Sequence, residues 1–458
     1  MKHFLHSFTT ITRSQFEQLA QAFVRVSSTQ MRSSGWLTSA TPRRERLLKG
    51  DPTLFQLVGE REISSLFVPF VQKKVVSGST AKVVIIGDLH GDYQTLTAVI
   101  TELRQQNYID DAWTLRPDIT IVCLGDYSNR GRSSVPVMAA LMHLFIHNPE
   151  NVILLRGNHE YALTNKLFNK RHMSKKGTEE EYLGEVSLLE ELQQRFEGYT
   201  YPDLLYWYDY LPQALFLGWD DEQSGKRQFV QLCHGGIEIG YNPGQLLHTS
   251  DDVAYEEFVR FDRGGTLRTL IDDKVLGQEV AQRMHDVLDY IKTTSSNGFE
   301  SLYADHTVID FKELQSSYHL RFGLQWNNFL SQRNDAILFA ASAKRKNLIF
   351  GSLLTKYFMQ QASSDNVTLF SIIRAHQHLN ETIQELGLRI TMLDDTCIGK
   401  GMVRQWGGLV YTLGASSEIS GVQSFIMLDC AGHTVCHYYK QPEQTTFSST
   451  QYRLHTEL

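Results

Sequence analysis

From residue 82 onward, short apolar runs typical of strands alternate with segments of helical periodicity. The first runs are KVVIIG (82–87), DITIVCLG (118–125) and NVILLRG (151–157). Between them, residues 93–106 place Leu96 and Leu103 on one helical face, and residues 135–149 form a second apolar helical segment that closes in a proline. Strands that alternate with helices in this way are typical of parallel βαβ units, so the pattern predicts an α/β fold.

The pattern changes outside this region. Further strand-like runs lie at 229–236, 369–378, 408–413 and 424–430. Residues 245–320 between them are polar with helical spacing, which predicts a helical insertion. Residues 1–80 are expected to form a mostly helical extension, and residues 441–458 a polar C-terminal tail. The main domain is therefore expected to span residues 81–440.

Composition narrows the class of protein. The chain has 458 residues, of which 42% are hydrophobic and 21% charged, as in ordinary soluble domains. A net charge of −7 argues against a general nucleic-acid binder, and no apolar run has the length of a membrane span. The 5 cysteines include no CxxC pair, which favours a reducing compartment, and we expect a cytoplasmic location, either native or in a host cell.

Polar side chains follow each of the strand-like runs. The set consists of Asp88, His90, Asp126, Asn158, His234 and His376. Ligands of open α/β sheets bind beyond the carboxyl ends of the strands, so these side chains are expected to converge. Carboxylates, imidazoles and an amide form a mixed oxygen and nitrogen set, which suits manganese, iron or zinc.

The same set can hold two ions. In a site about 3.5–4 Å across, one carboxylate must bridge the metals, and Asp126, in the middle motif, is the natural bridge. The first ion is then expected to bind Asp88, His90 and Asp126. The second ion is expected to bind Asp126, Asn158, His234 and His376. Next to these ligands, Arg130 offers a planar fork for phosphate oxygens, and His159 could protonate a leaving alkoxide.

The expected ligands and their neighbours lie in five short motifs: GDLHG (87–91), GDYSNRG (125–131), GNHE (157–160), HGG (234–236) and RAHQ (374–377). In their order along the chain, these motifs resemble those of the PPP family of metal-dependent phosphoprotein phosphatases. Three longer segments also match: LQWNNF (324–329), KRKNLIFG (344–351) and GGLVYTLGASSEISGVQSFIMLD (407–429). The resemblance implies a calcineurin-like β-sandwich flanked by helices, with α/β/β/α layers and the helical insertion as an addition. It also implies two divalent metal ions, with manganese expected and iron or zinc as alternatives.

The family resemblance also implies roles for individual residues. His159 becomes the general acid, and Arg130 and Asn158 become phosphate-binding residues. A second phosphate contact falls on Arg345, although the match there can slip by one residue to Lys344. The motif also favours His376 over His378 as the metal ligand. The nucleophile would be a hydroxide between the metals, and no covalent phosphoenzyme would form.

The sequence departs from the family at two places near the expected site. Most members have an aspartate where this chain has Asn129, and that aspartate accepts a hydrogen bond from the catalytic histidine. Asn129 is still expected to accept through its carbonyl oxygen and to orient His159, but it brings no charge to raise the pKa of the ring. The segment SSEISG (416–421) lacks the tyrosine that many eukaryotic members place over the site.

The sequence thus predicts a phosphoprotein phosphatase that acts on phosphorylated Ser/Thr, Tyr or both, of a divergent bacterial or effector-like kind. One alternative is a symmetrical dinucleoside-tetraphosphate hydrolase, which often lacks the carboxylate replaced by Asn129, but Glu160 favours a protein phosphatase. The other alternative is a non-catalytic scaffold of the same shape. Expected partners are a phosphoprotein substrate and a protein bound through residues 245–320, with no nucleic acid and no membrane span.

Overall fold

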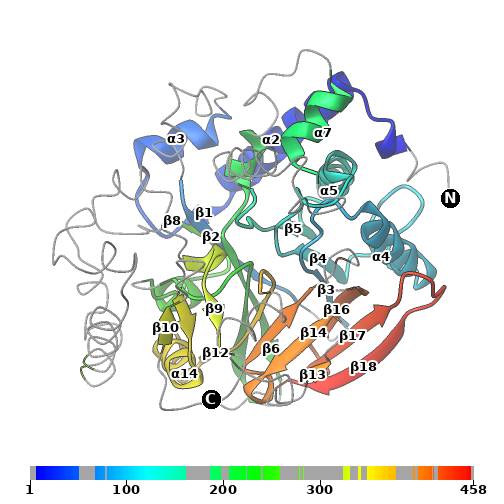
Figure 1. Ribbon diagram of the computed structural model, residues 1–458. Coiled ribbons are helices and arrows are strands. Elements are labelled where there is room, and N and C mark those ends of the chain that lie inside the picture. The colour runs from blue at the N-terminus through cyan, green and yellow to red at the C-terminus, as the bar shows by residue number, and fades with distance from the viewer. Residues whose placement is uncertain are drawn as a thin grey trace, which may run out of the picture.

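A computed structural model gives the fold of the chain (Figure 1). It describes residues 7–50, 68–77, 80–160, 186–196, 206–222, 224–238, 241–257, 278, 282, 323–330, 339–341, 348–377, 396–397, 401–414, 416 and 421–454. The expected phosphate contacts Arg345 and Lys344 lie outside these residues, as does His378.

Within the described residues, the strands form two large sheets and a small one. The 9-stranded sheet has the order β1 (Gly35–Trp36), β8 (Val253–Glu257), β2 (Phe70–Val75), β6 (Ala214–Asp221), β7 (Lys226–Cys233), β12 (Val367–Arg374), β15 (Val410–Leu413), β14 (Met402–Gln405) and β13 (Thr396–Cys397). The 6-stranded sheet has the order β18 (Ser448–Arg453), β17 (Thr434–Lys440), β16 (Gln423–Asp429), β3 (Lys82–Ile86), β4 (Ile119–Cys123) and β5 (Val152–Leu154). The 3-stranded sheet has the order β10 (Phe339–Ala341), β11 (Leu348–Phe350) and β9 (Asn328–Phe329).

Alternating side chains of the central strands pack in opposite directions. In β3, Val83 and Ile85 join a core shared with Leu232 of β7 and Ile373 of β12, so this core lies between the two large sheets. Val84 of the same strand belongs instead to the core on the helical side of its sheet. Strands buried on both faces explain the continuous apolar runs of the sequence.

Helices cover the outer faces of the sheets. They are α2 (Arg13–Ser33), α3 (Pro42–Leu48), α4 (Tyr93–Gln105), α5 (Ser134–His147), α7 (Leu188–Arg195), α8 (Gly244–Leu247) and α14 (Ser352–Gln361), with short 3₁₀ turns η3 (Tyr206–Tyr210), η4 (Gly323–Gln325) and η6 (Trp406–Gly408). Figure 1 shows α2, α5 and α7 grouped together, and α14, which contacts β12, at the opposite side of the molecule. The predicted sandwich of sheets flanked by helices is confirmed.

The parallel strands predicted from the sequence are present. β3, β4 and β5 pair in parallel, and β12 pairs in parallel with both β7 and β15. Residues outside the expected main domain also enter the sheets. β2 lies between β8 and β6, β18 forms the edge beside β17, and the range predicted as an insertion contains β8. Most of residues 245–320 lies outside the described residues.

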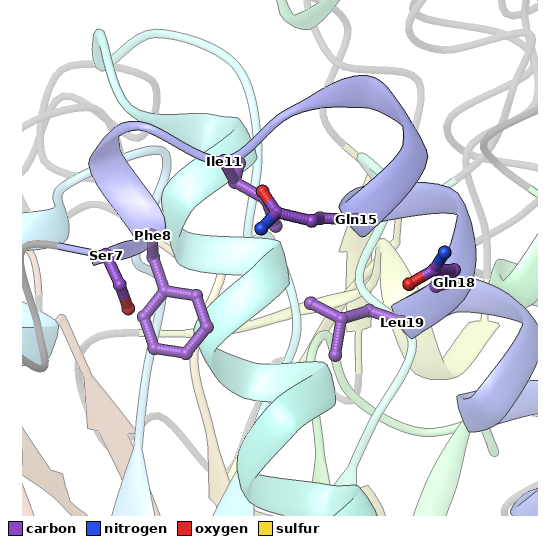
Figure 2. A pocket seen from close by; sticks show the side chains of 6 residues that line it. All are labelled: Ser7, Phe8, Ile11, Gln15, Gln18 and Leu19. Atoms are coloured by element: carbon purple, nitrogen blue, oxygen red, sulfur yellow. The ribbon is translucent and has the colours of Figure 1, made fainter.

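A shallow cavity lies at the N-terminal end of the described chain (Figure 2). It has a volume of about 310 Å³ and is lined by Ser7, Phe8, Ile11, Gln15, Gln18 and Leu19. None of these residues is charged, and none belongs to the predicted site. The cavity is therefore unrelated to the polar cluster at the ends of the central strands.

Candidate metal centre

The predicted ligand residues follow the carboxyl ends of strands from both large sheets. Asp88 and His90 follow β3, Asp126 follows β4 and Asn158 follows β5, all in the 6-stranded sheet. His234 follows β7 and His376 follows β12, both in the 9-stranded sheet. Every one of these side chains is buried, with at most 5% of its surface exposed. The structure thus brings together residues that are far apart in the sequence.

Three polar atoms of other residues surround one ring nitrogen of His234. Its Nε2 lies 3.1 Å from Oδ2 of Asp126, 2.9 Å from Oδ1 of Asn158 and 3.2 Å from Nδ1 of His376. A ring nitrogen carries at most one proton and can satisfy only one of these three neighbours by donating. A cation among these atoms would satisfy all of them, so the donor set fits a divalent metal.

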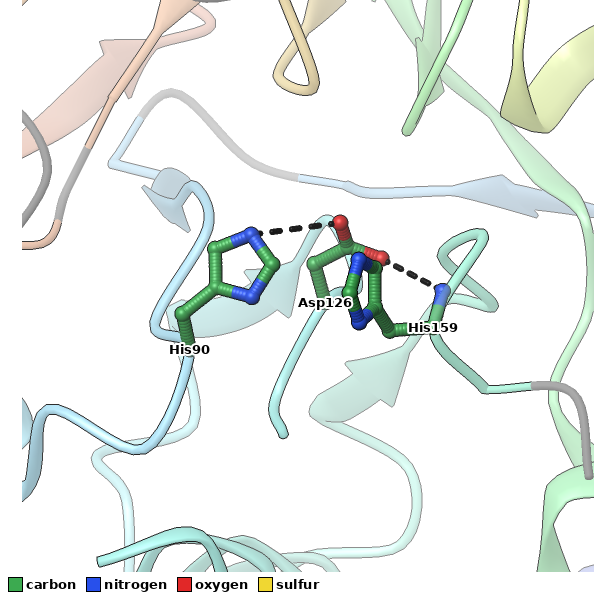
Figure 3. Close-up of side chains that lie close together, drawn as sticks. All are labelled: His90, Asp126 and His159. Carbon is green, nitrogen blue, oxygen red and sulfur yellow. Dashed lines mark hydrogen bonds and ion pairs between the residues drawn. The ribbon is translucent and has the colours of Figure 1, made fainter. Parts of the chain in front are cut away.

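Asp126 also belongs to a second group of candidate ligands. Its Oδ2 lies 3.4 Å from Nε2 of His90, and its Oδ1 accepts the backbone N–H of His159 at 2.8 Å (Figure 3). The candidate ligand atoms of His90, Asp126 and His159 lie within 4.8 Å of one another, as do those of Asp126, His234 and His376. The carboxylate predicted to bridge two ions is therefore common to both groups.

Neighbouring polar groups fix the orientation of these ligands. Nδ1 of His90 lies 3.0 Å from the carbonyl oxygen of Ser128, which favours the tautomer with its lone pair on Nε2, toward Asp126. The backbone N–H of His376 lies 3.2 Å from both carboxylate oxygens of Asp88. Asp88 in turn lies 3.4 Å from Nδ1 of His234.

Burial shapes the charge of the centre. Burial raises the pKa of Asp88 to about 6, with the His234 ring opposing this effect and Asp126 adding to it. Burial also lowers the pKa of His234, which favours the neutral ring that binds metals. Carboxylates buried this close together repel one another, and bound cations would supply the compensating charge.

Glu160 holds the loops of the centre through hydrogen bonds to their backbone, a role that was not predicted from the sequence. Its carboxylate accepts the backbone N–H groups of Asp126 at 2.7 Å, Tyr127 at 2.9 Å and Gly157 at 2.9 Å. Burial raises its pKa to about 8, and the nearby Asp126 carboxylate adds to the effect. Glu160 thus ties the loop after β4 to the loop after β5.

Several residues of the candidate metal centre have a backbone conformation that is rare for residues other than glycine. Positive φ angles occur at His90 (43°), Asp126 (53°), Asn129 (66°), Arg130 (72°) and His376 (66°). Side chains other than glycine seldom adopt this region, and such residues persist where surrounding contacts over-determine them. The loops also approach each other closely, because a Cβ atom added at Gly125 would lie 2.3 Å from the nitrogen of Gly157.

The contact between Asn129 and His159 has the opposite polarity to the one expected. The backbone N–H of Leu188 donates to Oδ1 of Asn129 at 2.9 Å, which fixes the amide with its nitrogen toward the imidazole. Nδ2 of Asn129 lies 2.9 Å from Nδ1 of His159. Since an amide NH₂ group only donates, Nδ1 of His159 is the acceptor. The carbonyl oxygen that was expected to receive the histidine proton is already engaged.

Arg130 and Ser416 lie beside the centre. Arg130 is half-buried, and its positive charge lowers the pKa of Asp88, against the larger effect of burial. Ser416, in the segment without the expected tyrosine, is buried and donates to Oδ2 of Asp92 at 3.2 Å. Asp92 caps α4, so this contact ties the segment to the loop that carries His90.

Comparisons with known proteins agree with the arrangement. The sequence model of the calcineurin-like phosphoesterases matches residues 81–379, well over half of the chain. The serine/threonine-protein phosphatase PP1-delta of Caenorhabditis elegans is 32% identical over 98 residues, which cover 20% of this chain and 29% of that protein. The chain thus spans less than a third of the length of this curated relative.

Two solved structures are similar over long stretches at low identity. A Saccharomyces cerevisiae protein serine/threonine phosphatase with similarity to human phosphatase PP5 has a TM-score of 0.47 at 13% identity, covering 100% of this chain and 98% of that chain. The cold-active protein-tyrosine phosphatase of a psychrophile, Shewanella sp., has a TM-score of 0.40 at 13% identity, covering 82% and 81%. At these scores, neither structure identifies an activity. Among the described residues, no helix has the length and apolar character needed to cross a membrane.

Proposed function

The chain belongs to the calcineurin-like phosphoesterase family, and on that premise we propose that it is a metal-dependent phosphoprotein phosphatase. The reaction is hydrolysis of a phosphomonoester on a serine, threonine or tyrosine side chain. The observation that carries the proposal is the meeting of three polar atoms, from Asp126, Asn158 and His376, around one nitrogen of His234, with Asp126 common to this group and to the group around His90.

The residues have distinct proposed roles. Asp88, His90, Asp126, Asn158, His234 and His376 hold two divalent cations, with manganese as the proposed metal. Such cations, when bound, lower the pKa of a water molecule and neutralise phosphoryl oxygens. Arg130, with Asn158, binds and orients the phosphate through N–H groups. Nε2 of His159 donates a proton to the leaving oxygen of the substrate.

The polarity of the Asn129 contact bears on this last role. A donor facing Nδ1 favours the neutral ring of His159, whereas proton donation to an alkoxide needs the charged ring. The proposed catalyst is therefore weaker toward alkoxide leaving groups than one with a carboxylate at position 129. Phenolic leaving groups need less help from an acid, which keeps phosphotyrosine within the proposed substrate range.

The experiment that tests the function compares substrates and metals. Protein loaded with Mn²⁺, Fe²⁺ or Zn²⁺ is assayed on phosphoserine, phosphothreonine and phosphotyrosine peptides and on diadenosine tetraphosphate, with Asp88→Asn as the control. We expect hydrolysis of at least one phosphopeptide in the wild type and loss of it in the control. Cleavage of the dinucleotide alone would instead establish the alternative hydrolase, and full turnover by Asp88→Asn would reveal a contaminating phosphatase.

Replacing Asn129 by aspartate is expected to extend activity to higher pH. The new carboxylate would accept a hydrogen bond from the Nδ1–H group and raise the pKa of His159, so the ring would remain protonated up to a higher pH. The alkaline limb of the plot of kcat against pH should then move up by about one pH unit. The matched control is Asn366→Asp, at an exposed position. An alkaline limb that stays in place in Asn129→Asp would contradict the proposed role of His159.

The remaining sequence predictions stay predictions. Binding of a protein through residues 245–320 concerns a range that lies mostly outside the described residues. The second phosphate contact, at Arg345 or Lys344, lies there too. An effector-like origin and a cytoplasmic location rest on the sequence arguments alone.

A further inference from the structure

Helix α5 begins directly after the loop that carries Asn129 and Arg130, and its N-cap side chain makes no capping bond. Ser133 is the N-cap residue, and its side chain accepts no hydrogen bond from the first turn. Its backbone N–H donates to the carbonyl oxygen of Gly91 at 3.1 Å. The third helical residue is Pro136, which has no N–H. The N–H groups of Ser134 and Val135 therefore still need acceptors.

Glu191 of α7 supplies both acceptors. Its Oε2 accepts the N–H of Ser134 at 2.7 Å, and its Oε1 accepts the N–H of Val135 at 3.2 Å. The side chain is buried, with 3% of the residue exposed, and its negative charge faces the positive end of the α5 dipole. One carboxylate from another helix thus completes the first turn of α5.

The same helix also contacts the loop directly. The N–H of Leu188, the first residue of α7, donates to Oδ1 of Asn129, and the N–H of Val186 donates to the carbonyl oxygen of Arg130 at 2.8 Å. Asn129 in turn donates its backbone N–H to Oγ of Ser134 at 3.2 Å. The Asn129 side chain therefore accepts a backbone N–H at the start of α7, while the Glu191 side chain accepts backbone N–H groups at the start of α5.

The carboxylate is itself held in place. Nε of Arg195 donates to Oε1 of Glu191 at 2.8 Å, and Nη1 of Arg195 donates to the carbonyl oxygen of Thr9 at 2.9 Å. Burial raises the pKa of Glu191, whereas Arg195 and the two backbone N–H groups stabilise its charged form. These contacts link the N-terminal segment to the start of α5.

We propose that Glu191 is a positioning residue for the candidate site, acting through Ser134 and Asn129 on the ring of His159. The inference rests on the proposed phosphatase function. Without both carboxylate oxygens, the start of α5 loses an acceptor and the loop between β4 and α5 gains freedom. Asn129 then no longer holds Nδ1 of His159 in a fixed direction. The metal ligands keep their own supports, notably the Glu160 carboxylate below Asp126.

The test is Glu191→Gln, which keeps the size of the side chain but turns one acceptor into a donor. We expect kcat on a phosphoserine peptide to fall about tenfold, because a misplaced catalytic group lowers the rate far more than binding. On p-nitrophenyl phosphate, whose leaving group needs no acid, the loss of kcat should be much smaller. KM should change less than about threefold, and metal content should stay at the wild-type level. Glu17→Gln, the same charge change on α2 in a partly exposed ion pair with Arg13, is the matched control and should behave as wild type.

A double-mutant cycle separates positioning from general destabilisation. In the background of Asn129→Ala, Glu191→Gln should lower kcat by less than about threefold, since the link to His159 is already broken. The same relative loss of kcat in both backgrounds, or an unchanged kcat in the single variant, overturns the proposal. If Glu191→Gln does not fold, Ser134→Ala removes only the hydroxyl that receives the Asn129 N–H. It should lower kcat about threefold, and an unchanged kcat would again overturn the proposal.

Hydrogen exchange gives a readout that does not depend on activity. Peptides covering residues 127–135 should exchange faster in Glu191→Gln than in wild type, whereas peptides covering β3 should not change. Unchanged exchange at 127–135 refutes the positioning role, even in an inactive protein. Absence of any phosphatase activity in wild type and Glu17→Gln, with faster exchange in Glu191→Gln, would instead reject only the proposed function.

Discussion

Replacing Asp126 by asparagine is expected to lower kcat/KM about a thousandfold or more. Asp126 is the one carboxylate common to both groups of candidate ligands, so the change weakens both metal positions at once. The loss corresponds to about 4 kcal/mol of transition-state stabilisation, in line with the several kcal/mol that a metal supplies. Steady-state kinetics with metal in excess and elemental analysis of the purified protein would measure the two effects.

The backbone around Asp126 should survive this substitution. An asparagine oxygen can still accept the N–H of His159, and Glu160 still binds the N–H of residue 126. The matched control is Asp118→Asn, just before β4, whose carboxylate pairs with Arg116 at 2.5 Å on the surface. Its kcat/KM should equal that of the wild type. Two tightly bound metal ions and near-normal turnover in Asp126→Asn would refute the bridging role.

Replacing His159 by glutamine is expected to produce a loss that depends on the leaving group. On a phosphoserine peptide, kcat should fall about 10²–10⁴-fold, because the alkoxide leaves only with a proton. On p-nitrophenyl phosphate the loss should be much smaller, since that leaving group needs no acid. Parallel assays of the two substrates, at equal metal loading, measure the difference.

A different role for His159 would give a different result. Its ring lies among the candidate ligand atoms of His90 and Asp126, so it could bind metal directly. In that case His159→Gln would lose metal and would be impaired equally on both substrates. The backbone N–H of residue 159 still reaches Asp126 in the variant, which isolates the contribution of the ring.

The metal ligands could be predicted because each follows a strand with a recognisable apolar pattern. Parallel strands bring their carboxyl ends to one edge, and this rule places Asp88, Asp126 and Asn158 together without knowledge of the loops. His234 and His376 also follow apolar strand-like runs, and the same rule placed them in the set, although their strands belong to the other sheet. The family motifs added the choice of His376 over His378.

The supports of the centre could not be predicted in the same way. Glu160 and Glu191 accept hydrogen bonds from backbone N–H groups, which every residue except proline has. No pattern of side chains in the sequence therefore predicts these contacts. The polarity of Asn129 is set by the N–H of Leu188, 59 residues further along the chain. The strand β8 was missed as well, because its residues, VAYEE, lie in a polar range that showed helical spacing further on.

The candidate ligands are divided between the two layers of the sandwich. Cations bound between β3, β4 and β5 on one side and β7 and β12 on the other would link the two sheets to each other. Any ion held only by the folded chain adds its binding free energy to the free energy of unfolding. A shortage of metal would then lower the free energy of unfolding as well as the catalytic activity. The lifetime of the folded protein would therefore depend on the metal concentration around it.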